Sequence, residues 1–322
     1  MNVILVASLY AVLVISVLLT VTVFALWFER KFAARMQSRL GPTMVGPAGL
    51  LQPVADAVKL MQKEDIRPEG ADWGLFNLAP ILAALCAIGA AAVVPFSPNM
   101  VLSDLDLGVL YVLAIGAVTV LPVFTAGWAS NNKFALLGGM RAVAQSISYE
   151  VPLLLGALVP VILAGSMNLS AIVRFQAEHH WLAVWPFFLG LPAFALFMLA
   201  MLAESNRIPF DIPEAESELV AGVTTEYTGM KFALFYLAEY VHTLVASAMA
   251  AVLFLGGWDG PFAPGLHWML LKTFLLFALV YWVRWSFLRF RSDQLMRICW
   301  YWLVPAGVVL VAVAGVWVVY EG

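Results

Sequence analysis

The chain has 322 residues, of which 63% are apolar and only 11% charged, and its formal net charge is −3. Because a soluble globular protein carries about 25% charged residues, this composition excludes an ordinary soluble fold and predicts a protein surrounded by lipid. The small negative charge gives no basis for nucleic-acid binding. Cys86 and Cys299 stand alone in apolar runs and no glycine-rich nucleotide loop occurs. We therefore expect no iron–sulfur cluster, no metal site and no redox cofactor in this chain.

Eight apolar stretches are long enough to cross a bilayer as helices, which requires about 20 residues each. The first has no Lys or Arg before Arg30 and is longer than a signal-peptide core, so we expect it to be retained. The fourth is longer than the bilayer requires and must tilt, kink or protrude. The sequence predicts one all-α transmembrane domain over residues 1–322, with spans at about 3–28, 75–95, 107–128, 138–165, 182–203, 232–256, 266–287 and 299–320.

The positive residues are distributed unevenly among the connectors between these spans. Fifteen of the 17 Lys and Arg residues fall in odd-numbered connectors, and only Arg174 and Lys272 lie on the other side. Cytoplasmic connectors carry the excess of positive charge in membrane proteins. We expect a multi-pass protein of the cell inner (plasma) membrane, or of an organelle inner membrane. Its odd connectors would face the cytoplasm or matrix, and both termini would lie on the periplasmic side.

The first connector contains a predicted surface helix from Leu50 to Lys63. Apolar side chains repeat on one face and polar ones on the opposite face, which is typical of an amphipathic helix in the membrane interface. The segment is too short to cross the bilayer, and on these residues alone a surface anchor is the simplest interpretation. The apolar face comprises Leu50, Val54, Val58 and Met61, and the polar face comprises Gln52, Asp56, Lys59 and Lys63.

The fifth connector, AESNRIPFDIPEAESELVAGVTTEYTGMK, is unusually acidic. Its prolines predict an extended start, after which Asp211 is expected to cap a short helix with Pro213 and Glu214 in its first turn. A solvated acidic loop is the alternative. However, the acids alternate with apolar residues, and half-buried carboxylates this close cannot all ionise freely, so some are expected to take up protons. The six acids are Glu204, Asp211, Glu214, Glu216, Glu218 and Glu226, and Arg207 is the one cation among them.

Two carboxylates fall inside predicted spans. Glu150 lies near the middle of the fourth span, and Glu239 lies about two turns into the sixth. A carboxylate at bilayer depth costs roughly 2.5–3.5 kcal/mol, so these groups are expected to face the bundle interior, with partners or protonated. His242 follows Glu239 by three residues and can share its helix face. A buried pair that only specifies helix packing is the alternative to proton handling.

Charged residues also gather at the ends of the first and seventh spans. Glu29, Arg30 and Arg39 follow the first span, and Arg284, Arg289 and Arg291 come at the end of the seventh. Taken alone, the arginines are interpreted as anchors on the positive side of the membrane.

Four segments closely resemble one protein family. They are FERKFAARMQSRLGPTMVGPAGLLQPVADAVKL (28–60), GWASNNKFALLGGMRAVAQSISYEV (127–151), AESNRIPFDIPEAESELVAGVTTEYTGMKFALFYLAEY (203–240) and RFRSDQLM (289–296). On these motifs, and on length and spacing over the whole chain, the sequence is identified as a member of the H subunits of proton-translocating NADH:quinone oxidoreductase, respiratory complex I.

The resemblance implies a subunit at the heel of the membrane arm, next to the quinone-site subunits of the peripheral arm and to small membrane-arm subunits beside the antiporter-like chain. Partner subunits would hold NADH, FMN and the iron–sulfur clusters, and quinone would be the substrate. This chain would form much of the quinone-access chamber and couple quinone reduction to proton translocation. By motif alignment, the chamber residues would be Glu29, Arg30, Arg39, Asp56, Arg207, Phe210, Asp211 and Tyr227. The proton-coupling residues would be Glu150, Glu204, Glu214, Glu216, Glu218, Glu226 and Glu239, and the basic partners would be Arg284, Arg289 and Arg291.

Three other functions fit parts of the sequence. The homologous membrane subunit of an energy-converting hydrogenase has a related fold but no quinone, and the full acidic connector favours the quinone enzyme. A stand-alone proton-coupled transporter predicts internal repeats with paired broken helices, and no clear repeat is visible. A passive membrane anchor explains the spans but leaves Glu150, Glu239 and the acidic connector unexplained.

Overall fold

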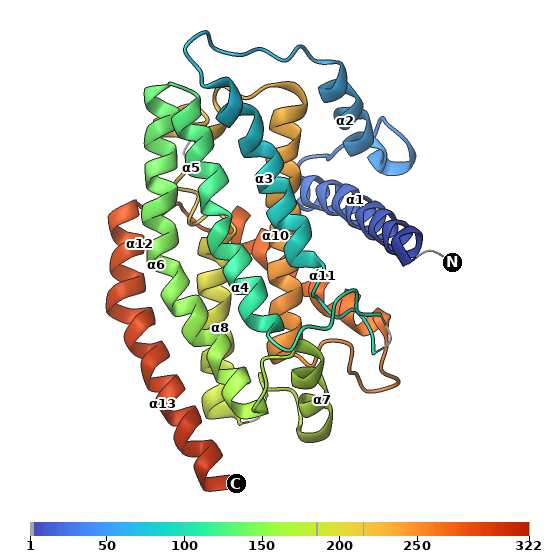
Figure 1. The fold of residues 1–322 in the computed structure, drawn as a ribbon, viewed down its shortest axis with the longest axis vertical. Helices are drawn as coiled ribbons and strands as arrows, with labels where there is room; N and C mark the ends of the chain where they lie inside the picture. Colours follow the sequence, from blue (N-terminus) through green and yellow to red (C-terminus); the bar gives the residue numbers. More distant parts are fainter. Residues whose placement is uncertain (1–2, 99, 185, 215, 322) are drawn as a thin grey trace.

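The computed structural model describes residues 3–98, 100–184, 186–214 and 216–321. Its regular elements are helices, and no strand occurs in these described ranges (Figure 1). In chain order they are α1 (Val3–Met36), η1 (Pro47–Gly49), α2 (Gln52–Gln62), α3 (Trp73–Ala91), α4 (Gly108–Val118), α5 (Val120–Ala129), α6 (Lys133–Ala164), α7 (Leu169–His179), α8 (Phe187–Glu204), α9 (Glu216–Leu219), η2 (Gly222–Thr224), α10 (Gly229–Phe254), α11 (Leu266–Ser286), α12 (Ser292–Ile298), η3 (Cys299–Leu303) and α13 (Val304–Glu321).

Six helical segments of the described chain are long and apolar enough to cross a membrane, and a seventh apolar helix, Phe188–Glu204, is shorter. The prediction of an all-α membrane protein is therefore confirmed. The six segments coincide with six of the eight predicted spans. They are Trp73–Ala91, Gly108–Ala129, Lys133–Ala164, Gly229–Phe254, Leu266–Ser286 and Ser292–Tyr320.

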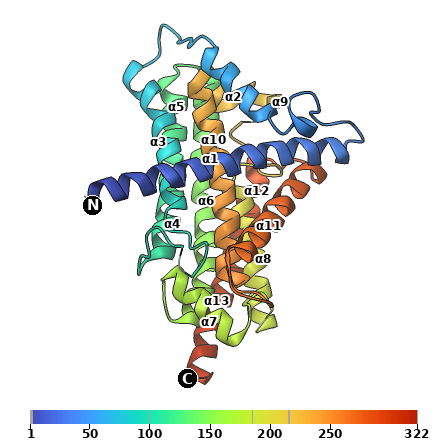
Figure 2. The same ribbon diagram turned by 90° about the vertical axis from the view of Figure 1, so that its right-hand side faces the viewer.

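The first and fifth predicted spans differ from this pattern. Helix α1 contains the predicted first span, but it continues to Met36 and lies across the long axis of the other helices (Figure 2). Helix α8 begins only at Phe187, because Pro186 forms its N-cap in an extended conformation. The segment before it makes a turn rather than a helix.

Irregularities inside the spans have identifiable backbone causes. Helices α4 and α5 are separated at Thr119, and Pro122, which lacks an N–H donor, lies in the first turn of α5. The last span contains a π-helical turn at Cys299–Leu303, which divides α12 from α13. By contrast, α6 continues through Pro152 and Pro160 as one long helix.

Helix α10 is the centre of the bundle. Of its most apolar 18-residue window, 78% is buried, against 11% for the span that contains α13. It packs most extensively on α3, and also on α11, α6 and α8. Ser247, Ala248, Ala250 and Ala251 are fully or almost fully buried, and such small side chains let neighbouring helices approach closely. Most side chains of α13, by contrast, face outward, toward lipid or another protein.

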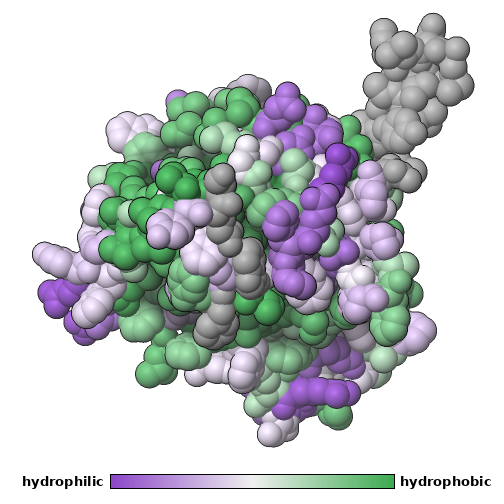
Figure 3. Space-filling view, turned by 90° about the horizontal axis from the view of Figure 1, so that it is seen from below, coloured by the Kyte–Doolittle hydropathy of each residue, from purple (hydrophilic) through white to green (hydrophobic). Residues whose placement is uncertain are grey.

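The predicted amphipathic helix is present as α2, Gln52–Gln62. Val54, Val58 and Met61 are exposed on its outer face. The prediction of a helix capped by Asp211 is wrong: residues 212–214 form turns and α9 begins at Glu216. Helix α7 was not anticipated in the outer connector, where Asn168 caps it by accepting a hydrogen bond from the N–H of Ala171. Seen from the α7 end, the surface is largely apolar, with hydrophilic residues in a few patches (Figure 3).

Candidate functional site

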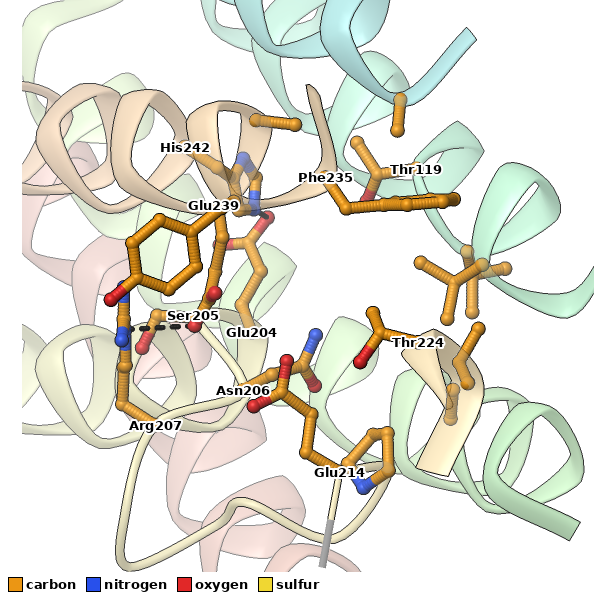
Figure 4. Close-up of a pocket in the computed structure, with 18 of the residues that line it drawn as sticks. Thr119, Glu204, Ser205, Asn206, Arg207, Glu214, Thr224, Phe235, Glu239 and His242 are labelled. Carbon is orange, nitrogen blue, oxygen red and sulfur yellow. Dashed lines mark ion pairs between the residues drawn. The ribbon is translucent and has the colours of Figure 1, made fainter. Parts of the chain in front are cut away.

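A cavity of about 330 Å³ lies between α3, α5, α6, α10 and the connector that follows α8. One side of it is apolar, with alanines of α3 and the side chains of Val120, Val123, Phe232 and Phe235. The other side gathers charged and polar groups from the connector and from α10 (Figure 4). These groups are Glu204, Ser205, Asn206, Arg207, Glu214, Thr224, Glu239 and His242, with Thr119 and Arg284 at the margins.

The connector is held over the cavity by Gln145, a buried residue of α6. Its side-chain amide donates to the carbonyl oxygens of Ala203 (2.7 Å) and Phe210 (2.9 Å) and to the side-chain oxygen of Asn206 (3.1 Å). Asn206 has a φ of 49°, in the left-handed region that asparagine tolerates better than most residues, and it ends α8. The chain therefore turns back immediately after Glu204 and brings Arg207 under α10.

Arg207 and Glu239 form the central ion pair of the cavity. The guanidinium Nε lies 3.0 Å from the carboxylate of Glu239, and Arg207 is only 2% exposed. The guanidinium also lies over the rings of Tyr240 (4.6 Å to the centroid) and Tyr281 (5.4 Å). Burial disfavours the charged guanidinium, but the charges of Glu239, Glu29 and the neighbouring tyrosines together outweigh this effect and raise the pKa of Arg207. The arginine is therefore a permanent buried cation.

A second ion pair extends this cluster to the first helix. Arg284 of α11 and the hydroxyl of Tyr240 both donate hydrogen bonds to Glu29, which is 5% exposed at the end of the hydrophobic part of α1. Arg284 also lines the cavity. Helices α1, α10 and α11, together with the connector after α8, thus contribute charges to one buried network. Its negatively charged residues are Glu29 and Glu239, and its positively charged residues are Arg207 and Arg284.

Glu204 and His242 form a further pair across the cavity wall. Their Oε1 and Nε2 atoms are 3.3 Å apart, and both side chains are largely buried. Glu204 is the last residue of α8, and His242 lies on α10, one turn after Glu239 (Figure 4). The sequence placed His242 on the face of Glu239, whereas the structure pairs it with the acid of another helix.

Glu214 lies in the connector and faces the cavity from the side opposite α10. Burial, together with the negative charges of Glu239 and Asp211, raises the pKa of Glu214 to about 8. Near neutral pH this carboxyl group therefore carries a proton that it can release.

Glu218 has the opposite environment. It is half exposed and bridges Arg141 of α6 (2.6 Å) and Arg289 (3.2 Å). The hydrogen bond from Arg141, with the charges of the nearby arginines, lowers the pKa of Glu218 and favours the carboxylate. This residue lies outside the cavity lining and connects the connector to two other segments by ion pairs.

The remaining predicted residues lie around the cavity rather than in it. Asp56 of α2 pairs with Arg30; burial opposes its ionisation, but hydrogen bonds from Arg30 and Gln52 outweigh this and lower its pKa. The ring of Tyr227 stacks on Phe76, with centroids 4.2 Å apart. The other contacts are Phe210 stacked on Phe290, Glu226 accepting from Asn132, Glu150 accepting from Ser146, Arg39 donating to Gln37, and the Arg291 N–H donating to Gln294. The side chain of Glu216 lies outside the described part of the chain.

Several site residues were not singled out from the sequence. Gln145, Tyr149 and Tyr240 lie within the segments that carry the family resemblance but were given no role, and Tyr281 lies outside those segments. Among the described residues, no group of His, Cys, Asp and Glu side chains is arranged to hold a metal ion. The charged groups on one side of the cavity are suited to acid–base chemistry, and together with the apolar groups on the other side they are suited to bind an amphiphilic molecule.

The fold and site define a multi-pass helical membrane protein with a buried network of carboxylates and arginines beside a partly apolar cavity. A family model described as NADH dehydrogenase matches residues 9–315. The chain is 48% identical to the H subunit of NADH-quinone oxidoreductase from Brevibacillus brevis, over 97% of this chain and 93% of that protein. It is 46% identical to the H subunit from Burkholderia vietnamiensis (96% and 91%) and 48% identical to that from Dehalococcoides mccartyi (90% and 80%). The chain belongs to the NADH dehydrogenase family, among the H subunits of NADH-quinone oxidoreductase, as its motifs indicated.

Proposed function

We propose that this chain is the membrane subunit of a proton-translocating NADH:quinone oxidoreductase that admits quinone from the bilayer and couples its reduction to proton movement. The observation that carries the proposal is the cavity itself. It places the buried Arg207–Glu239 pair and the protonated Glu214 beside an apolar wall. Membership of the H-subunit family supports the same function.

The cavity matches the chemistry of a quinone. A quinone has a polar ring with two carbonyl oxygens and an apolar tail, so it needs an apolar corridor that leads to hydrogen-bond donors. A volume of about 330 Å³ lies within the usual range for small-molecule sites. In the proposed function, Glu29, Arg30, Arg39 and Asp56, with the exposed apolar face of α2, form the opening toward the membrane interface. Phe210, Asp211 and Tyr227 belong to the connector beside the cavity.

Reduction of the bound molecule changes the charge that the carboxylates experience. A quinone takes up two electrons and two protons to become a quinol, and the electrons come from the partner subunits that hold NADH, FMN and the iron–sulfur clusters. Glu214 is protonated near neutral pH and faces Glu239 across the cavity, so it is suited to supply or replace such a proton. Glu204 and Glu239 continue the route into the bundle, and Glu150, Glu216 and Glu226 are assigned to the same route.

In the proposed function, the half-exposed Glu218 has a structural role within the coupling machinery. Because it is ion-paired with Arg141 and Arg289, it keeps the connector attached to α6 and to the segment after α11 rather than carrying protons. Arg289 and Arg291 lie at the cytoplasmic surface in the proposed orientation, where they would contact peripheral-arm subunits. Small membrane-arm subunits would cover the outward face of α6 and α13.

The proposed topology is that of an inner-membrane protein with eight membrane helices, in which α1 and α8 are added to the six segments named above. The connectors that hold α2, α9 and α12 carry most of the positive charge, so they would face the cytoplasm and both termini would face the periplasm. An organelle inner membrane would have the same arrangement relative to its matrix.

Photo-crosslinking with an azido-quinone on intact membranes tests the proposal. Labelled peptides from the first connector or from α10 are expected, and an excess of unlabelled quinone should remove the label. Label confined to other subunits would contradict the proposal. A hydrogenase subunit of the related type would likewise give no quinone-protected label.

A further inference from the structure

A second, smaller cavity of about 20 Å³ lies deeper in the bundle, between α3, α4, α6, α8 and α10. Its wall is apolar except for two residues, Glu204 and His242, which also line the main cavity. The volume is sufficient for one water molecule, which requires polar partners to be stable there. The Glu204–His242 pair therefore lies between the two cavities. The main cavity contains further charged groups, whereas the rest of the wall of the smaller cavity is apolar.

The two groups of this pair are in ion-pair contact. The Oε1 of Glu204 lies 3.3 Å from Nε2 of His242. Both ring nitrogens are buried, and neither has a hydrogen-bond partner in the part of the chain that the structure describes. Glu204 is the last residue of α8, where the negative end of the helix dipole disfavours a second negative charge unless a cation lies beside it.

The surroundings of His242 leave few other groups to exchange a proton with it. Glu239 precedes it on α10 and Glu204 faces it from α8. The other titratable or charged groups that line the main cavity with it are Tyr149, Arg207, Glu214, Tyr236 and Arg284. The residues of α3 and α4 that line either cavity with it, Ala83, Ala87, Ala90, Val112 and Leu113, do not titrate.

The absence of a side chain at Gly116 leaves the space that the carboxylate of Glu204 occupies. A Cβ atom built on Gly116 of α4 would lie 2.5 Å from Oε1 of Glu204, closer than real Cβ atoms approach. Only glycine at this position lets the carboxylate lie against α4 and still reach His242. Substitution of Gly116 thus displaces the carboxylate while both members of the pair remain.

We propose that His242 and Glu204 form a proton-holding pair that takes up one proton from the main cavity and returns it as the charge in that cavity changes. The imidazole accepts the proton at Nε2 from the carboxyl group of Glu204, which leaves an imidazolium beside a carboxylate. Glu204 receives this proton from an acid that lines the main cavity, such as Glu214, whose carboxyl group becomes a carboxylate. Transfer back from the imidazole to Glu204 and then to that carboxylate restores the neutral ring and the starting acid. This inference rests on the proposed function and assigns to it a residue outside the acidic series.

The test uses the intact enzyme in membranes, with quinone reductase activity and proton pumping measured against pH. In His242→Gln, both rates should fall about tenfold or more at neutral pH, since acid–base groups contribute about 10²- to 10⁴-fold. NADH oxidation by a water-soluble acceptor should stay unchanged. The decline in rate toward low pH that follows from protonation of the imidazole should be absent from the variant. A role in packing alone would lower the rate equally at every pH.

Two further variants keep the test decisive. Gly116→Ala should remove the same decline in rate toward low pH (the acid limb of the pH profile) although His242 is present. This variant tests the role of the pair if His242→Gln does not assemble into the enzyme. His179→Gln, at an exposed outer histidine stacked on Phe175, should match the wild type. An unchanged acid limb and unchanged pumping in either His242→Gln or Gly116→Ala would overturn the inference. If Glu239→Gln also pumped normally, the proposed function itself would fail.

Discussion

The clearest prediction concerns the proton on Glu214. Its pKa of about 8 exceeds the ordinary value of 4.5 because of burial and of the neighbouring acids. Each pKa unit corresponds to about 1.4 kcal/mol, so the ionised form is disfavoured by about 5 kcal/mol in the folded protein. Wild-type quinone reductase activity should therefore decline as the pH rises through about 8 and the proton is lost. Glu214→Gln removes that proton and should lose most proton pumping together with this alkaline limb.

The pH dependence of protein stability is an independent test of the raised pKa of Glu214. A carboxyl group whose pKa is raised by folding stabilises the folded protein least when it is ionised, so its unfavourable contribution is absent below about pH 4.5 and complete above about pH 8. Glu214→Gln should raise the thermal midpoint of the solubilised complex at pH values above about 8, with a much smaller gain below about pH 5.

The assay compares NADH-driven reduction of a short-chain quinone and dye-reported pumping in inverted vesicles, normalised to the reaction with a water-soluble acceptor. Glu178→Gln, on the exposed face of α7 at the opposite end of the bundle, is the matched control and should behave as wild type. Normal pumping by Glu214→Gln, with the alkaline limb intact, would refute the reasoning.

Three further predictions concern the surrounding ion pairs and the first connector. Glu239→Gln leaves the buried Arg207 without its carboxylate, which should destabilise the complex by about 3–5 kcal/mol in thermal denaturation; a normal midpoint would contradict the pairing. Glu218→Gln breaks half-exposed pairs, so the thermal midpoint should change little and pumping should persist, and lost pumping would show that Glu218 carries protons. Gly49→Ala places a Cβ against the carbonyl of Pro42 at a φ of 77°, so membranes should contain less assembled subunit by immunoblot, and normal amounts would disprove the crowding.

Composition and periodicity predicted the parts of this fold that depend on one helix at a time. Apolar length located α3, α6, α10 and α11, and the alternation of faces located α2, because lipid and interface select residues by polarity alone. The start of α8 and the break at Thr119 depend on local proline geometry, which apolar length and periodicity do not predict to the residue. The turns at 212–214 replace the expected helix because Gln145 holds the preceding chain from another element.

The site was predicted in its residue types but not in its pairings. The acids Glu204, Glu214 and Glu239 do meet at one cavity, as their density in the sequence indicated. The partner of His242 depends on how α8 crosses α10, which no spacing within one helix reveals. The same holds for the aromatic faces of Tyr240 and Tyr281 around Arg207, since these residues are far apart in sequence.

Infrared difference spectroscopy of the oxidised and quinol-reduced enzyme tests most directly whether buried acids exchange protons as the cavity's occupant is reduced. The account predicts a carboxyl C=O band that changes on reduction in the wild type and is lost in Glu214→Gln, while Glu178→Gln keeps it. A spectrum without any change in the carboxyl region on quinone reduction, or one identical in the wild type and Glu214→Gln, would contradict the account.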